Sequence, residues 1–233
     1  MRVNQLFAGL LLIIISACTK NQPPAEPPPG NTVIYYDKNS STQVVSQIFK
    51  YDGIIETNLT NDLTYNYWWV RVSADKTKFL CYRSPKVNNN YLDNKSNDYA
   101  NADLMVFNID GTNPKVIIQK GKYGWSEQGV AKFSPDGTKI LMAALCTDPA
   151  RGSNDLHWRL VITDINGNNP KIISTRNSLF ADPAWSPDGK KIVYVTLPPG
   201  MLIGYQDQFE LYAADYNATT KEIENEIRLT NDD

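Results

Sequence analysis

From about residue 32 onward, the chain alternates short apolar stretches with polar segments rich in Gly, Pro, Asn and Asp. In the stretch Ile140 to Ala143, side chains 140 and 142 share one face and side chains 141 and 143 the other, as in a β-strand. Strands of this length, separated at regular intervals by turn residues, are typical of an all-β domain.

One of these strand pairs is repeated along the chain. Residues 131–143 (AKFSPDGTKILMA) recur as residues 184–195 (AWSPDGKKIVYV), and residues 70–82 (VRVSADKTKFLCY) are a degraded copy. Counting from serine to serine, the copies are 61 and 52 residues apart (73 to 134, 134 to 186). The longer gap contains residues 86–101, an Asn-rich tract that we interpret as a loop insertion.

The centre of the repeat predicts a tight turn. Proline presets φ at the first corner, Ser begins the turn, Asp tolerates the second corner, and Gly takes the left-handed position that follows. We therefore assign a structural role to the two complete copies: Ser134, Pro135, Asp136 and Gly137, and Ser186, Pro187, Asp188 and Gly189.

A second hairpin repeats in phase with the first. Residues 103–118 (DLMVFNIDGTNPKVII) match residues 159–174 (RLVITDINGNNPKIIS), and residues 47–53 and 210–217 are outer copies. The Asp-Gly and Asn-Gly pairs are strong hairpin signals. Two hairpins per unit of roughly 40–50 residues predict a four-stranded antiparallel blade of a β-propeller.

The pattern Phe/Trp-Ser-Pro-Asp-Gly-x-x-Ile resembles the TolB-type, WD40-like propeller repeat, over nearly all of residues 32–233. We expect about four blades, the first of them partial (residues 32–62). The resemblance implies six blades, so the sequence is truncated, or four blades close the ring, or another chain completes it. We favour truncation or an open arc.

The first residues have the three parts of a secretory signal peptide. Arg2 is basic, Leu6 to Ile15 are apolar, and small residues precede Cys18. The apolar run is shorter than the roughly 20 residues that a membrane-spanning helix needs. Ile15-Ser16-Ala17-Cys18 resembles the bacterial lipobox, which implies cleavage before Cys18 and lipidation of its thiol; the alternative is a plain secretory signal with an incidental Cys.

These features predict three segments. Residues 1–17 form the signal peptide, residues 18–31 the lipidated Cys and a linker, and residues 32–233 the propeller domain, in whole or in part. The linker contains five prolines, which favour extended polyproline geometry. By resemblance to bacterial sorting rules, Thr19 indicates an outer-membrane anchor that faces the periplasm.

Composition excludes several classes of function. Once the signal peptide with Arg2 is removed, the chain has 22 Lys and Arg and 25 Asp and Glu, a net charge of −3. Binding of nucleic acid needs a basic surface, so this composition argues against it.

Cys81 and Cys146 could form a disulfide after export, although two free buried thiols are the favoured interpretation.

We find no catalytic constellation in the sequence. The Gly-x-Ser-x-Gly elbow of the hydrolases that carry similar propellers does not occur, and His157 is the only imidazole, which we expect at the surface or in blade packing. We therefore predict no catalytic residues, no metal site and no cofactor, and a chain that is not an enzyme.

Binding remains as the predicted function. Alternate residues of the run from Tyr65 to Trp69 should be buried, and Trp185, at the repeat position of Phe133, should be core. The resemblance implies a partner in the envelope, a protein such as the peptidoglycan-associated lipoprotein that TolB binds, or a glycan. The alternative is that the chain is the propeller part of a larger envelope peptidase or polysaccharide-degrading enzyme.

Overall fold

The computed structural model describes residues 32–39, 45–86, 98–174, 182–199 and 209–231. The chain divides into two compact units, Met1–Thr32 and Val33–Asp233, and the described strands belong to the second. The expected loop insertion falls largely outside the described residues, as do Cys18 and its linker.

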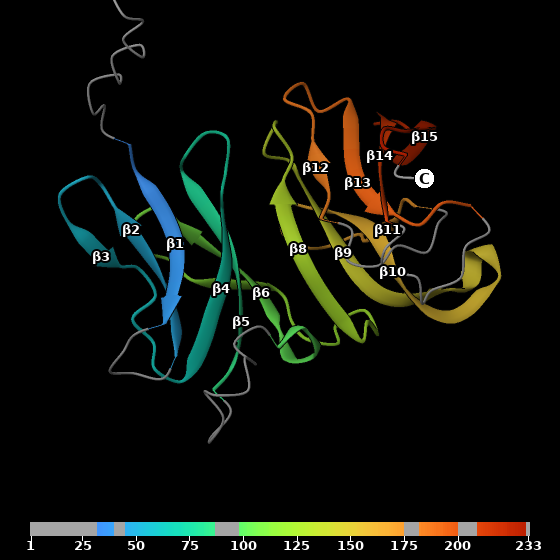
Figure 1. Ribbon diagram of the computed structural model, residues 1–233. Helices are drawn as coiled ribbons and strands as arrows, with labels where there is room; N and C mark the ends of the chain where they lie inside the picture. Colours follow the sequence, from blue (N-terminus) through green and yellow to red (C-terminus); the bar gives the residue numbers. More distant parts are fainter. Residues whose placement is uncertain (1–31, 40–44, 87–97, 175–181, 200–208, 232–233) are drawn as a thin grey trace, which may run out of the picture. The chain divides into compact units, whose positions relative to one another are not determined.

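The domain is all-β, as predicted, and its strands form four antiparallel sheets (Figure 1). The first sheet has three strands: β1 (Ile34–Asn39), β2 (Ser46–Tyr51) and β3 (Glu56–Asn58). The second has four: β4 (Tyr65–Val72), β5 (Lys78–Pro85), β6 (Asp103–Asn108) and β7 (Lys115–Ile118).

The third and fourth sheets repeat the order of the second. The third contains β8 (Glu127–Phe133), β9 (Lys139–Asp148), β10 (Ser153–Asp164) and β11 (Lys171–Ile172). The fourth contains β12 (Ala184–Trp185), β13 (Lys191–Thr196), β14 (Glu210–Asn217) and β15 (Glu222–Arg228). In each sheet, strands that are neighbours in sequence are hydrogen-bonded neighbours, which is the up-and-down order of a propeller blade.

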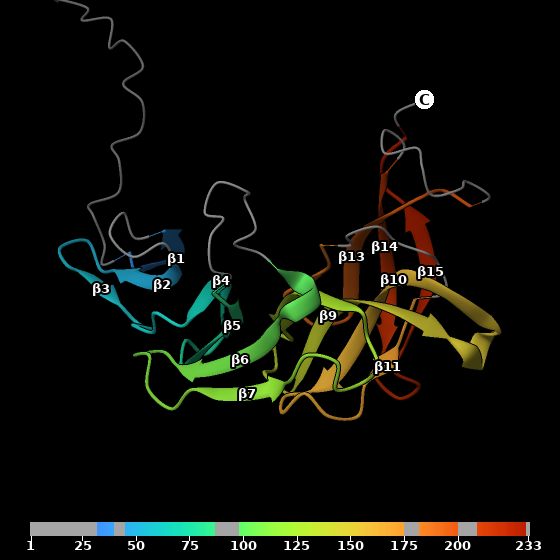
Figure 2. The same ribbon diagram turned by 90° about the horizontal axis from the view of Figure 1, so that it is seen from below.

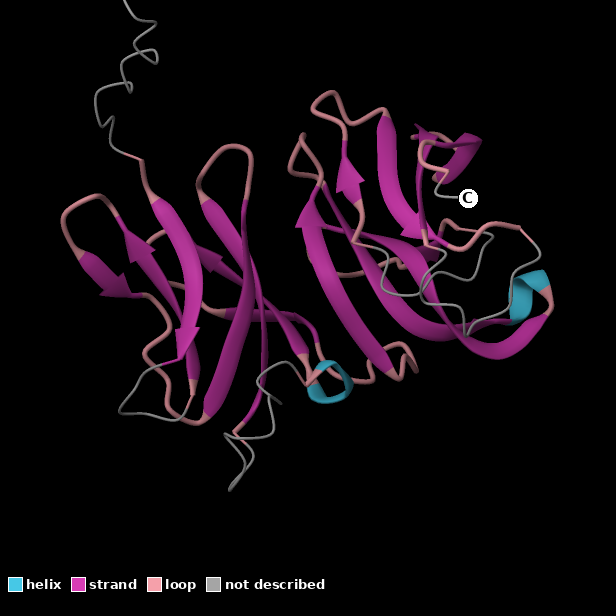
Figure 3. Ribbon diagram, viewed as in Figure 1, coloured by secondary structure: helices cyan, strands magenta, loops and turns pink. Residues whose placement is uncertain are grey.

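Helical structure is confined to two short 3₁₀ turns in the described residues, η2 (Tyr99–Asn101) and η3 (Pro149–Arg151), the cyan segments of Figure 3. No helix in this part of the chain is long and apolar enough to cross a membrane.

Successive sheets share their apolar faces. One cluster joins residues of β2 to residues of β4, β5 and β6, with Ile48 and Phe79 fully buried. A second joins the second sheet to the third, and a third joins the third sheet to the fourth. The alternation in β9 explains how one strand serves two junctions: Ile140 and Met142 belong to one cluster and Leu141 to the next, as the sequence predicts.

Turn glycines make these junctions close. In the β10–β11 hairpin, a Cβ on Gly167 would lie 2.5 Å from Ile118 Cγ1 and 2.6 Å from the carbonyl oxygen of Ile117, both in the second sheet. In the β6–β7 hairpin, a Cβ on Gly111 would lie 2.6 Å from the carbonyl oxygen of Leu59, just after β3. In the second and third sheets, the hairpin between the third and fourth strands therefore places its glycine against the end of the preceding sheet. Figure 2 shows β11 next to β7.

The first sheet is the incomplete one. Its strands correspond to the second, third and fourth strands of the other sheets, because residues 47–53 match the third-strand repeat. This agrees with the expected partial blade at residues 32–62. Among the described residues, β1 pairs only with β2.

Candidate functional site

Three turns with the same hydrogen bonds connect the first and second strands of the last three sheets. In the β8–β9 turn, Ser134 Oγ donates to Asp136 Oδ1 (2.5 Å) and accepts from the Lys139 backbone N–H (2.9 Å). The Gly137 N–H closes the turn on the Ser134 carbonyl oxygen (2.9 Å). One serine hydroxyl thus joins the aspartate to the start of the next strand, which fixes the hairpin register.

The β12–β13 turn repeats this pattern with its own residues. Ser186 Oγ donates to Asp188 Oδ1 (2.6 Å) and accepts from the Lys191 N–H (2.9 Å), and Gly189 N–H bonds to the Ser186 carbonyl oxygen. Pro187 lies between them, as Pro135 does in the preceding sheet.

The degraded copy between β4 and β5 keeps the turn although it lacks Pro and Gly. Ser73 Oγ donates to Asp75 Oδ1 (2.6 Å), and the Lys76 N–H bonds to the Ser73 carbonyl oxygen (2.9 Å). Lys76 takes φ of 57°, where the complete copies have Gly137 at 68° and Gly189 at 70°. A residue with a Cβ therefore occupies a left-handed position, which is disfavoured.

These hydrogen bonds hold the turn carboxylates in their charged form. The Ser134 hydroxyl and, after it, donors of Thr138 lower the pKa of Asp136 to about 2, against the opposing effect of partial burial. The serine hydroxyl is likewise the main cause that lowers the pKa of Asp75 and of Asp188. These aspartates stabilise turns, and their lowered pKa makes them poor proton donors near neutral pH.

The first strands of the second and third sheets are bent by matching bulges. The register of β4 with β5 shifts between Trp68 and Arg71, and that of β8 with β9 shifts between Gly129 and Lys132. The extra residues, Trp69 and Val130, have φ of 61° and 56°. Bulges re-aim side chains and are frequent beside functional sites.

A groove of about 430 Å³ runs along the ends of these first strands, where they enter the three turns. Each of the last three sheets contributes to its lining: Val72, Ala74, Lys132, Phe133, Ser134, Pro135, Ala184, Trp185, Ser186 and Pro187. The groove combines two aromatic side chains with proline rings and hydroxyl groups, a composition suited to recognition by contact.

One charged residue, Lys132, lines the groove. Lys132 Nζ donates to Asp182 Oδ1 at 2.6 Å, which joins the third sheet to the segment before β12. On β4 the guanidinium of Arg71 lies 4.2 Å above the ring of Trp69, a cation–π contact. The Trp69 backbone N–H also donates to Asp37 Oδ1 on β1 (3.2 Å).

The aromatic residues divide between core and surface differently from the expectation. Tyr67 and Trp68 are both buried, so the expectation that only alternate residues of this run are buried is wrong. The two side chains lie on opposite faces of β4, and each face packs in a core cluster of its own. Trp185 packs its ring edge-on to Tyr216 (5.0 Å between centroids), as a core residue does, but it also lines the groove.

The cysteines and the histidine of the described residues do not line the groove. Cys81 and Cys146 are free and buried, and burial raises the pKa of the Cys146 thiol to about 11. His157 lies on β10 opposite Cys146. Within the described ranges, no group of three or more His, Cys, Asp or Glu side chains could hold a metal ion.

Sequence reasoning did not identify the groove. Its residues come from three turns that lie up to about 110 residues apart, and nothing in one copy indicates that the copies adjoin. The available signal was the repeat itself, because equivalent turns of successive blades lie at the same end of a propeller.

Comparison with known proteins agrees with this architecture. No family model matches the chain. The Tol-Pal system protein TolB of Wigglesworthia glossinidia brevipalpis is 46% identical over 48 residues, which are 21% of this chain and 11% of that protein. TolB of Blochmanniella pennsylvanica is 35% identical over 100 residues, 38% of this chain and 22% of that protein. The chain thus matches less than a quarter of the length of either curated relative.

Solved structures resemble nearly the whole domain. TolB from Acinetobacter baumannii aligns with a TM-score of 0.57 at 16% identity, over 86% of this chain and 41% of that one. A TolB structure from Agrobacterium tumefaciens gives 0.57 at 15% identity, over 84% and 62%. A puromycin-hydrolyzing peptidase of Mycobacterium tuberculosis gives 0.54 at 12% identity, over 85% and 29%. With its repeated blades and shared turn geometry, the chain has the β-propeller fold of these TolB structures.

Proposed function

We propose that this chain is an exported lipoprotein, anchored through Cys18, whose propeller is a non-catalytic scaffold that binds an envelope protein or glycan. The observation that supports this most is the groove, because three successive blades build it from repeated elements and give it aromatic, hydroxyl and charged groups. Such a surface can recognise a partner without any reacting group.

The anchor would place this surface in the envelope. A lipid on Cys18 followed by a Pro-rich linker gives a tethered domain, and several acyl chains make attachment lasting, at about 0.8 kcal/mol for each buried CH₂. We propose the outer membrane, on its periplasmic side. The relatives named as Tol-Pal system proteins support a protein partner in that compartment.

Affinity isolation from solubilised membranes tests the binding role. Lys132→Glu would place two acidic groups together at the groove and should lower recovery of the partner roughly tenfold, the effect of losing about 1.4 kcal/mol of binding free energy. The matched control is Lys115→Glu, a charge reversal at an exposed position of β7. Equal recovery with both variants, when both unfold at the wild-type temperature, would remove the groove from the proposal.

A second candidate function follows from the peptidase among the structural neighbours: the chain would be the propeller part of a larger envelope enzyme. The coding sequence downstream of codon 233 distinguishes the two. More propeller repeats alone favour the binding scaffold, whereas a Gly-x-Ser-x-Gly elbow in an α/β-hydrolase pattern favours the enzyme.

A further inference from the structure

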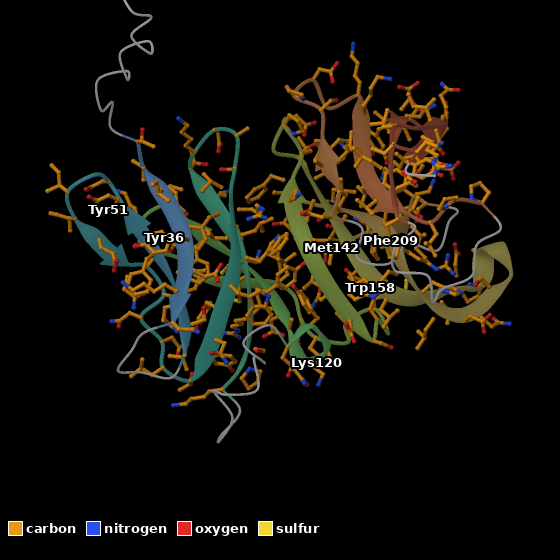
Figure 4. The ribbon with its side chains drawn as sticks, in the orientation of Figure 1. Tyr36, Tyr51, Lys120, Met142, Trp158 and Phe209 are labelled. Atoms are coloured by element: carbon orange, nitrogen blue, oxygen red, sulfur yellow. The ribbon has the colours of Figure 1, made fainter. Side chains whose placement is uncertain are left out.

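The hairpin between β2 and β3 exposes two isoleucines. Ile54 is 87% and Ile55 60% exposed, the highest values among the large exposed hydrophobic side chains of the described residues. Three more exposed apolar or aromatic side chains, Val33, Ile34 and Tyr51, lie at the same end of the sheet, since Ile34 is the cross-strand partner of Tyr51. We call these five residues the apolar tip; Tyr51 is labelled in Figure 4.

The tip is held in a defined shape. Asp52 Oδ1 accepts hydrogen bonds from the backbone N–H groups of Ile54 (3.0 Å) and Ile55 (2.8 Å), and Tyr51 Oη donates to the carbonyl oxygen of Gly53 (2.9 Å). These bonds satisfy the turn from within, so that the two isoleucines project away from it without a structural task in the hairpin.

The other three sheets provide an internal comparison. The hairpins β6–β7, β10–β11 and β14–β15 occupy the same place in their sheets, and none of their exposed turn positions carries Leu, Ile, Val or an aromatic residue. Where such a hairpin adjoins a preceding sheet, its glycine makes the contact, while Thr112 and Asn113, or Asn168 and Asn169, stay exposed. Contact between blades therefore does not require Ile54 and Ile55 to be apolar.

The position of the tip indicates what covers it. Val33 and Ile34 are the residues at which the preceding N-terminal segment joins the domain, so the tip is the end of the domain nearest to Cys18 along the chain. Cys18 is 15 residues before Val33, and a fully extended chain spans at most about 3.6 Å per residue, so a lipid on Cys18 can be no more than about 54 Å away.

We propose that the apolar tip enters the lipid interface beside the acylated N-terminus and orients the domain on the membrane; this rests on the proposed lipid anchor. Apolar and aromatic side chains enter the interface to a depth of about 5–10 Å, and Tyr is favoured there because its ring is apolar and its hydroxyl polar. A second copy of the chain fits less well, because a stable protein interface takes about 20–30 residues a side.

Fluorescence of the full-length lipoprotein in phosphatidylethanolamine–phosphatidylglycerol vesicles tests this. A solvent-sensitive NBD label is placed at Ile54→Cys, with Leu156→Cys on β10, another exposed apolar position, as the control. Cys81 and Cys146 are buried and free, so they react poorly, and lipidation blocks Cys18. Lipids with a doxyl group near the headgroup should quench the label at 54 several-fold more strongly than the label at 156.

A second labelled variant tests the isoleucines themselves. When the label is at Ile55→Cys, adding Ile54→Thr to the same chain should lower the quenching from its value with Ile54 intact toward the value at position 156. Equal quenching at 54 and 156, in protein whose acylated Cys18 is seen by mass spectrometry, would overturn the tip and leave the anchor standing. Absence of the acyl groups would overturn the anchor first. If the NBD emission at position 54 indicates an apolar environment that doxyl lipid does not quench and that is lost on dilution, the tip contacts a second copy of the chain instead.

Discussion

Trp69 of β4 and Val130 of β8 occupy the same place in successive sheets: each precedes its turn serine, Ser73 or Ser134, by four residues and has positive φ. A β-branched residue such as Val is disfavoured there, and Val130 is held by burial with Ala143 and Trp158. Both bulges lie in first strands, just before the turns that border the groove, so the repeat preserves a bend as well as a turn.

The turn residues give a prediction about backbone strain. Lys76→Gly should stabilise the domain by about 1 kcal/mol, because glycine adopts positive φ without a Cβ penalty. Gly137→Lys should destabilise it by about the same amount, since a Cβ there meets no atom within 4 Å and only the backbone conformation is penalised. Urea unfolding of the Cys18→Ser chain measures both; two effects of the same sign would contradict the explanation.

The junction glycines should be less tolerant than the turn glycines. Gly167→Ala should cost about 2–4 kcal/mol, because its Cβ would overlap Ile118 and the Ile117 carbonyl group in addition to the φ penalty. Gly137→Ala, with almost the same φ and open space, is the matched control and should cost about 1 kcal/mol. If the two free energies of unfolding fall equally, the sheets are not in contact as described.

Stability should fall in acid through the turn carboxylates. The pKa of Asp136 is about 2 in the folded chain against 3.8 ordinarily, so its contribution is present above pH 3.8 and is lost as pH falls toward 2. Because this carboxylate is more than half exposed, screening limits the contribution to about 1 kcal/mol or less.

Asp136→Asn should therefore be less stable than the wild type at pH 7 and nearly equal to it at pH 2. Chemical denaturation at the two pH values measures this, with Asp155→Asn, at an exposed position of β10, as the control. A deficit that persists unchanged at pH 2 would show that the charge of Asp136 is not what stabilises the turn.

The lipid anchor has its own test. Cys18→Ser should abolish metabolic labelling with palmitate and release the domain from membranes into the soluble fraction, because no acyl chain would remain to hold it. Labelling that survives the substitution would place the lipid on another residue and disprove lipidation of Cys18.

The sequence was sufficient to predict the blades because their turns are specified locally. Ser134 to Gly137 and Ser186 to Gly189 contain in four residues each the groups that close the hairpin, and even the copy at Ser73 keeps its hydrogen bonds. Alternation in β9 was equally predictable, since regular pairing preserves a period of two.

Other features depend on interactions that are distant in sequence. Tyr67 and Trp68 are both buried because separate core clusters cover the two faces of β4, which the run of residues alone does not indicate. The groove arises only when Ala74, Phe133 and Trp185 are brought together from three sheets. The structure shows that Ile54 is exposed, and comparison with the equivalent hairpins of the other sheets shows that an exposed apolar residue at this place is unusual.

Photo-crosslinking from the groove in intact cells tests the central claim most directly. Ala184 is exposed and lines the groove, so a benzoylphenylalanine in its place should form an adduct with one envelope component on irradiation. The adduct should be absent with the same probe at Leu156 and lost when Lys132→Glu is added. No adduct from position 184, or one that forms equally from 156 or despite Lys132→Glu, would contradict a scaffold that binds through this groove.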